Sequence, residues 1–129
     1  MANPNLVSVT SIVGNTSSIL ISSTSNPFAT ALVNNLAASG KVYKINSIVV
    51  ANVDGSAAAD ITINIYSNAT AGSGSAFALA STISVPADST LIVTDKTTSF
   101  YLLENQSIGA IAGTANDLVV TASWEEINS

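Results

Sequence analysis

Short runs of β-branched residues alternate with polar residues along most of the chain, and turn residues separate the runs. The clearest run covers residues 59–67, in which Ile61, Ile63 and Ile65 alternate with polar side chains. A period of two places alternate side chains on opposite faces of a β-strand. This segment therefore predicts a strand that buries its isoleucine face.

The same pattern predicts a series of further strands and no long helix. Their ranges are 6–13, 18–22, 41–53, 77–85, 89–94, 100–104, 107–112 and 118–125. Gly14-Asn15 is expected to close the first run, and residues 30–36 fit either a strand or a helical turn. About eight to ten short strands favour an all-β fold, a two-sheet antiparallel sandwich of jelly-roll type.

The run from Lys41 to Val53 changes parity in its middle. Tyr43 and Ile45 share one parity, whereas Ile48 and Val50 share the other. One extra residue in a strand shifts the parity in this way, so we expect a β-bulge near Asn46-Ser47.

The length of 129 residues predicts a single β-sandwich domain over residues 1–129. Residues 1–35 are rich in Ser and Thr and are expected to form an N-terminal arm or edge strands. No fixed-period repeat and no domain boundary is visible in the sequence.

The amino-acid composition excludes several kinds of catalytic and binding site. The chain has no Cys, no His and no Arg, and only 9% of its residues are charged, with a net charge of −5. Disulfides, thiolate metal sites and Cys or His nucleophiles are therefore impossible. Three basic residues cannot build a phosphate-binding patch, so nucleic acid is not an expected partner. No apolar run is long enough to span a membrane.

The start of the chain lacks the positive charge and apolar run of a signal peptide. We therefore expect synthesis in a host cytoplasm. Because neutral, Ser/Thr-rich β-proteins are common in extracellular fibres, adhesins and viral shells, the expected destination is a particle released by lysis, such as a virion. A cytosolic protein of unusual composition is the alternative.

Three groups of polar residues are candidate sites, and each is better explained by local structure. Asn52, Asp54 and Asp60 offer oxygen ligands, but they lack the frame of a calcium loop, so turn chemistry is preferred. Glu125 and Glu126 are neighbours on a strand and point to opposite faces. The sequence Gly72-Ser73-Gly74 lacks the lysine of a phosphate loop. No catalytic, cofactor-binding or metal residue is predicted.

The few aromatic residues divide between core and surface. Trp124 shares the parity of Leu118 and Val120 and is expected in the core. Tyr66 lies on the face opposite the isoleucines, which favours a surface or an interface. Tyr43, Tyr66 and Phe77 are the candidate residues for contact with other subunits.

Four stretches resemble a family of small structural proteins of marine tailed bacteriophages, notably those that infect cyanobacteria. They are the opening MANPNLV, KVYKINSIVVANVDG from Lys41 with its continuation at residues 58–62, ISVPADSTL from Ile83, and LVVTASWEE from Leu118. The resemblance implies a virion structural protein without catalytic residues. Residues 104–107 depart from the more acidic turn that the family leads us to expect, which argues against metal binding there.

These observations favour a non-enzymatic virion structural protein, either a capsid decoration protein or a component of a fibre or neck. Its expected partners are identical subunits, as a homotrimer, and other virion proteins. The alternative is a glycan-binding adhesin or fibre-tip module that recognises the host surface. A third interpretation, a lytic enzyme, is nearly excluded by the residue types present, although glycoside hydrolysis needs only two carboxylates about 5–10 Å apart.

Overall fold

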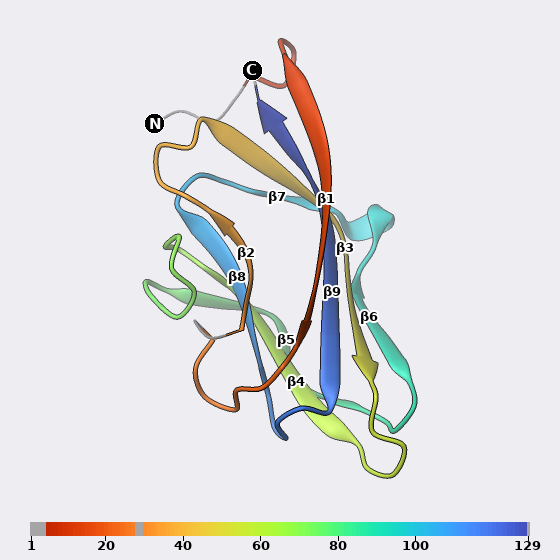
Figure 1. Cartoon of the computed structure of the whole chain (residues 1–129). Coiled ribbons are helices and arrows are strands. Elements are labelled where there is room, and N and C mark those ends of the chain that lie inside the picture. The colour runs from red at the N-terminus through yellow and green to blue at the C-terminus, as the bar shows by residue number, and fades with distance from the viewer. Residues whose placement is uncertain (1–4, 28–29, 129) are drawn as a thin grey trace.

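The structure is a computed structural model that describes residues 5–27 and 30–128 (Figure 1). Nearly all of its regular structure within these ranges is β-strand. The strands are β1 (Ser11–Leu20), β2 (Ala31–Asn35), β3 (Lys41–Asn52), β4 (Ala59–Tyr66), β5 (Ala76–Val85), β6 (Thr90–Thr94), β7 (Phe100–Leu102), β8 (Gln106–Ala112) and β9 (Leu118–Asn128). One 3-10 turn, η1 (Lys96–Thr98), joins β6 to β7.

The strands form two antiparallel sheets that face each other (Figure 1). The five-stranded sheet has the order β1-β9-β3-β6, with β7 also paired to β3. The four-stranded sheet has the order β2-β8-β4-β5. Early strands thus pair with late ones: β1 with β9, β2 with β8, β3 with β6 and β7, and β4 with β5. The predicted all-β, two-sheet antiparallel sandwich is confirmed.

The core lies between the two sheets and follows the predicted alternation. Ile61 and Ile63 of β4 are 0% exposed, and they belong to one apolar cluster with Ile48 and Val50 of β3. Burial of β-branched side chains on two facing sheets is the main force that holds such a sandwich together.

The β-bulge predicted in the longest run is confirmed. Ile45 lies opposite Trp124 and Ser47 lies opposite Ser123, so Asn46 is the extra residue of β3. The Asn46 amide instead donates to the Glu125 carboxylate at 2.9 Å. The bulge lets Ile45 and Ile48, which have opposite parity, both reach the core.

The predicted break at Gly14-Asn15 is wrong. β1 runs through both residues, and its ten residues pair with β9 without a shift of register. Gly14 has no positive φ, so its backbone continues the strand. The ambiguous segment 30–36 contains a strand, β2, because it pairs with β8.

Two buried asparagines connect the sheets by hydrogen bonds. Asn35 of β2 donates to the carbonyl oxygens of Lys41 and Leu102, at 2.9 and 3.2 Å. Asn52 of β3 donates to the carbonyl oxygens of Ala57 and Val85, at 3.0 and 2.9 Å. Because buried amides must find partners, these bonds also fix how the sheets align.

Candidate functional site: a pocket over Tyr66

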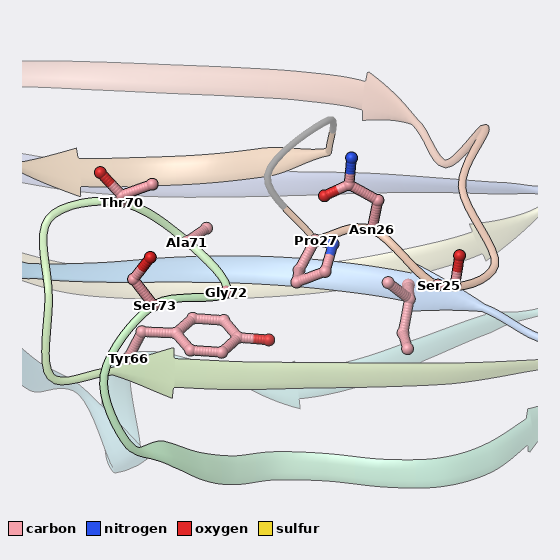
Figure 2. A pocket seen from close by; sticks show the side chains of 9 residues that line it. Ser25, Asn26, Pro27, Tyr66, Thr70, Ala71, Gly72 and Ser73 are labelled. Atoms are coloured by element: carbon pink, nitrogen blue, oxygen red, sulfur yellow. The ribbon is translucent and has the colours of Figure 1, made fainter.

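A pocket of about 550 Å³ lies on the outer face of the four-stranded sheet (Figure 2). One side is formed by the 67–75 loop after β4, and the other by the segment that leads to β2. Its lining residues are Ser25, Asn26, Pro27, Tyr66, Thr70, Ala71, Gly72, Ser73 and Ile111. Two segments that are distant in sequence therefore build one site.

Glycine in β8 allows these two segments to approach the sheet. A Cβ atom placed on Gly109 would lie 3.0 Å from the Ala71 Cβ and 3.2 Å from the Pro27 Cβ. Ala71 is accordingly only 2% exposed. The loop is further held by the Ser107 hydroxyl, which donates to the Asn68 carbonyl at 2.7 Å. The pocket walls are thus packed onto the sheet.

Tyr66 lies on the face opposite the isoleucines, as its parity indicates, yet it is only 6% exposed. Its hydroxyl accepts a hydrogen bond from the Asn64 amide at 3.2 Å. Figure 2 shows the ring along the pocket, with the hydroxyl pointing away from the 67–75 loop. The two covering segments, which sequence alone did not place there, account for this burial.

The lining of the pocket is chemically neutral. Hydroxyl groups of Ser25, Thr70 and Ser73, the Tyr66 phenol and the Asn26 amide supply its polar side-chain groups. A smaller pocket of about 190 Å³ shares Ile111 and adds the carboxylate of Asp60. This arrangement suits hydrogen bonding to a neutral polar ligand better than proton transfer.

Two of the three candidate calcium ligands, Asn52 and Asp54, take part in turn chemistry, whereas Asp60 lies within β4. The Asn52 side-chain oxygen accepts from the Asp54 backbone N–H at 2.9 Å, and the Asp54 carboxylate accepts from both the N–H and the hydroxyl of Ser56. Within the described ranges, no three acidic side chains gather in a way that would hold a metal ion.

Glu125 and Glu126 have separate partners. Glu126 accepts from Lys41, 3.2 Å away, and from the Asn15 amide at 2.9 Å. Glu125 accepts from the Asn46 amide. The two carboxylates are therefore used in different contacts, as expected for neighbours on a strand.

Tyr43 and Trp124 stack at one end of the core. Their ring centroids are 6.5 Å apart with an interplanar angle of 25°. Trp124 packs against the core as predicted, although it remains partly exposed. Burial raises the pKa of the Tyr43 phenol, the negative charge of Glu126 raises it further, and Lys41 opposes the shift. Tyr43 is therefore not a free surface residue: it is half-buried and packs against the core.

Phe77 differs from the other two candidate interface residues because it lies on the surface. It is 61% exposed on β5, the edge strand of the four-stranded sheet. The three candidate interface residues therefore differ in exposure: Phe77 is on the surface, Tyr66 lies under a loop, and Tyr43 packs against Trp124.

A second surface feature lies on the outer face of the five-stranded sheet. Leu20 lies beside Val119, which lies beside Ala51, and Val49 lies beside Ile92 in the next row. We call these five residues the outer apolar band. Ile92 is 62% exposed and Leu20 is 45% exposed. Sequence parity separated the two faces of the later strands but not of residues 18–22, and it did not show that these rows would adjoin.

Comparison with known proteins adds a remote likeness in fold. No protein-family model and no curated protein matches the chain. A solved structure described as "Bacillus endospore appendages form a novel family of disulfide-linked pili" aligns over 100% of this chain and 94% of that chain, with 19% identity and a TM-score of 0.49. A likeness this remote supports no conclusion about function. Separately, the described residues contain no helix that is long and apolar enough to cross a membrane.

Proposed function

We propose that the chain is a non-enzymatic structural subunit of a tailed-bacteriophage particle, located on the capsid surface or in a fibre or neck. It acts by packing against identical copies and other virion proteins. The symmetric homo-oligomer expected for such a subunit follows the common rule for soluble assemblies. The homotrimer remains a prediction.

The observation that carries this proposal is the outer apolar band. Its apolar side chains adjoin across four paired strands, and Ile92 and Leu20 present large exposed surfaces. Contiguous apolar surface on a soluble protein commonly marks a contact with another protein. A chain with only 9% charged residues is also suited to interfaces with little ion pairing.

The order of the strands agrees with this role. Nested pairing of early with late strands in two facing sheets is the arrangement of a jelly roll, a fold used in viral capsids and lectins. Fold alone does not establish function. The resemblance of residues 41–55 and 118–126 to phage structural proteins directs the choice towards a virion component.

The solution mass of the purified chain, measured by light scattering behind size exclusion, tests the proposal. We expect a species several times larger than 13.0 kDa at micromolar concentration. Ile92→Lys should reduce that mass, because a charge would be buried in the interface. Val53→Lys is the matched control, since Val53 is also an exposed apolar residue, at 58%, but lies outside the band.

A wild-type chain that remains a 13.0 kDa monomer at every concentration would contradict self-assembly. Equal losses of mass in Ile92→Lys and Val53→Lys would contradict the band as the interface. Circular dichroism of each variant shows whether the sandwich itself is intact.

The pocket over Tyr66 favours a second candidate, a glycan-binding module. A neutral site of hydroxyl and amide groups beside an aromatic ring can hydrogen-bond a sugar, although the low exposure of Tyr66 leaves little ring for stacking. Titration with neutral oligosaccharides, followed by amide NMR shifts, tests this function. Shifts confined to residues 25, 26 and 70–73 would support it, and their absence at millimolar sugar would reject it.

A further inference from the structure

The edge strand β1 is unusual among the edges of this sandwich. It is ten residues long, keeps an unbroken register with β9, and contains no proline and no charged residue. Natural sheets protect their edges with short strands, bulges, prolines or charges, because an exposed edge invites pairing with another chain. None of these protections is present in β1.

The other three edges carry such protection. β2 has only five residues and a register shift against β8. The opposite edge of the five-stranded sheet is divided between β6 and β7, and β6 is itself shifted against β3. β5 is as long as β1 but has two register shifts against β4 and a positive φ of 50° at Thr82. The contrast singles out β1.

The backbone groups that point outward from β1 follow from its pairing with β9. The Ile21 N–H donates to the Leu118 oxygen at 2.8 Å, which places this pair in the hydrogen-bonded class. Hydrogen-bonded pairs alternate along an antiparallel ladder, so the even-numbered residues from 12 to 20 direct their N–H and C=O groups away from β9. β9 is the only strand paired with β1 in the described part of the chain.

Gly14 does not interrupt the regular edge of β1. Glycine weakens the interior of a strand and often marks a bulge, a positive φ or the close approach of another backbone. Gly14 has no bulge and no positive φ, and a Cβ placed on it would meet nothing within 4 Å. No contact that the structure describes within the chain therefore requires glycine at this position.

We infer that β1 pairs antiparallel with β1 of a second copy of this chain, about a two-fold axis at Thr16. In this register Thr16 faces its own counterpart, and Gly14 faces Ser18 of the second copy. Ile12, which is 58% exposed, faces Leu20 of the second copy, which is 45% exposed. Apolar side chains directly opposite each other stabilise a cross-strand pair. The two five-stranded sheets thereby become one continuous sheet.

A shift of the axis by one residue makes a poorer match. With the axis at Asn15, Ile12 would face Ser18 of the second copy, and Leu20 would lie beyond the paired segment. Only with the axis at Thr16 do both exposed apolar residues, Ile12 and Leu20, lie opposite an apolar residue of the second copy. The occupant is thus a second copy of the same strand. This inference rests on the proposed self-assembly and adds to the outer apolar band a second contact with two-fold symmetry, which replaces the predicted trimer with a dimer or a multiple of dimers.

Cysteine cross-linking tests both the pairing and its register, because the natural chain has no cysteine. Hydrogen-bonded antiparallel pairs have Cα atoms about 5.5 Å apart, within the range that a disulfide spans. Thr16→Cys should therefore form a disulfide-linked dimer under mild oxidation. Ser84→Cys, an exposed position on the other long edge strand β5, is the matched control. We expect at least about tenfold more cross-linked dimer for Thr16→Cys, because pairing raises the local thiol concentration.

The register is tested by two further single variants. Ile12→Cys alone and Leu20→Cys alone should not cross-link. In the paired dimer each thiol lies eight residues along the strand from the same thiol of the second copy, a distance of roughly 27 Å. A mixture of the two should give the mixed dimer. Thr16→Lys should lower the solution mass by placing like charges opposite each other, whereas Ser84→Lys should not.

The outcomes separate this inference from the proposed function. A larger species whose Thr16→Cys variant does not cross-link above the Ser84→Cys control, or a trimer unaffected by Thr16→Lys, overturns β1 pairing and leaves self-assembly standing. Cross-linking of Ile12→Cys or Leu20→Cys alone overturns the register. A wild-type monomer without cross-linking overturns both the inference and the proposed function.

Discussion

The outer surfaces of the two sheets differ in how far the chain itself covers them. The four-stranded sheet is covered in part by its own chain, because the 67–75 loop and Pro27 pack over Gly109 and bury Tyr66. The five-stranded sheet keeps Leu20 and Ile92 of the outer apolar band exposed and leaves β1 as a long, regular edge. The difference teaches that apolar surface on one sheet is buried within the chain and stabilises its fold, whereas on the other it stays open to solvent, where the proposed assembly would use it.

The contrast between the two sheets predicts that the largest loss of stability follows a change at Tyr66. Tyr66→Ala removes a buried ring beneath the covering loop and should lower the free energy of unfolding by about 3 kcal/mol. Urea unfolding measures this loss. Tyr66→Phe, which removes only the hydroxyl bonded to Asn64, should cost about 1 kcal/mol. Equal stability of the alanine variant and the wild type would show that the covering loop adds little.

A smaller loss of stability is expected from a change at Asn52, whose hydrogen bonds connect the two sheets. Asn52→Ala leaves the carbonyls of Ala57 and Val85 without their amide donor and should cost about 2 kcal/mol. Thermal or urea unfolding would reveal it. Ser56→Ala is a suitable control, because its hydroxyl bonds to Asp54 on the exposed part of the same turn. A loss no greater than that of the control would contradict the alignment role.

Tyr43, which stacks on Trp124, should make the stability of the fold depend on pH in the alkaline range. Because burial and Glu126 raise the pKa of folded Tyr43 above that of the unfolded chain, stability is full below the unfolded value and falls as pH rises through the folded one. Tyr43→Phe should flatten this decline above about pH 10. Trp124 fluorescence during urea unfolding reports it. An unchanged decline in the variant would assign the effect to other groups.

The smallest effect on the fold is expected in the outer apolar band. Ile92→Ser should change the unfolding free energy of the monomer by less than about 0.5 kcal/mol, because the side chain is 62% exposed. The measurement is made on samples dilute enough to be monomeric. A loss comparable to that of Tyr66→Ala would mean that the two sheets do not differ in this respect.

Much of the fold was predictable because the alternation of side chains is a local property. The isoleucines of β4 marked a buried face, and the parity change in β3 located the bulge at Asn46. Gly14-Asn15 misled the prediction, because glycine and asparagine favour turns only when no partner strand holds them extended. Here β9 pairs with both residues.

The candidate site was beyond local reasoning. Parity placed Tyr66 on the outer face, but its burial depends on Pro27 and Ala71, which reach Gly109 from distant parts of the chain. Gly72-Ser73-Gly74 was recognised as a loop, whereas its position against Pro27 was not encoded in its spacing.

The sequence by itself therefore determined the strands from residue 41 onward, their buried faces, the bulge and the neutral chemistry of the surface, because each depends on residue type and on neighbours a few positions away. The tertiary structure alone decided the strand order, the covering of Tyr66, the joining of the outer apolar band and the exposure of the β1 edge. These depend on contacts between residues far apart in the chain, and the two-residue period of a strand says nothing about which strand lies beside it.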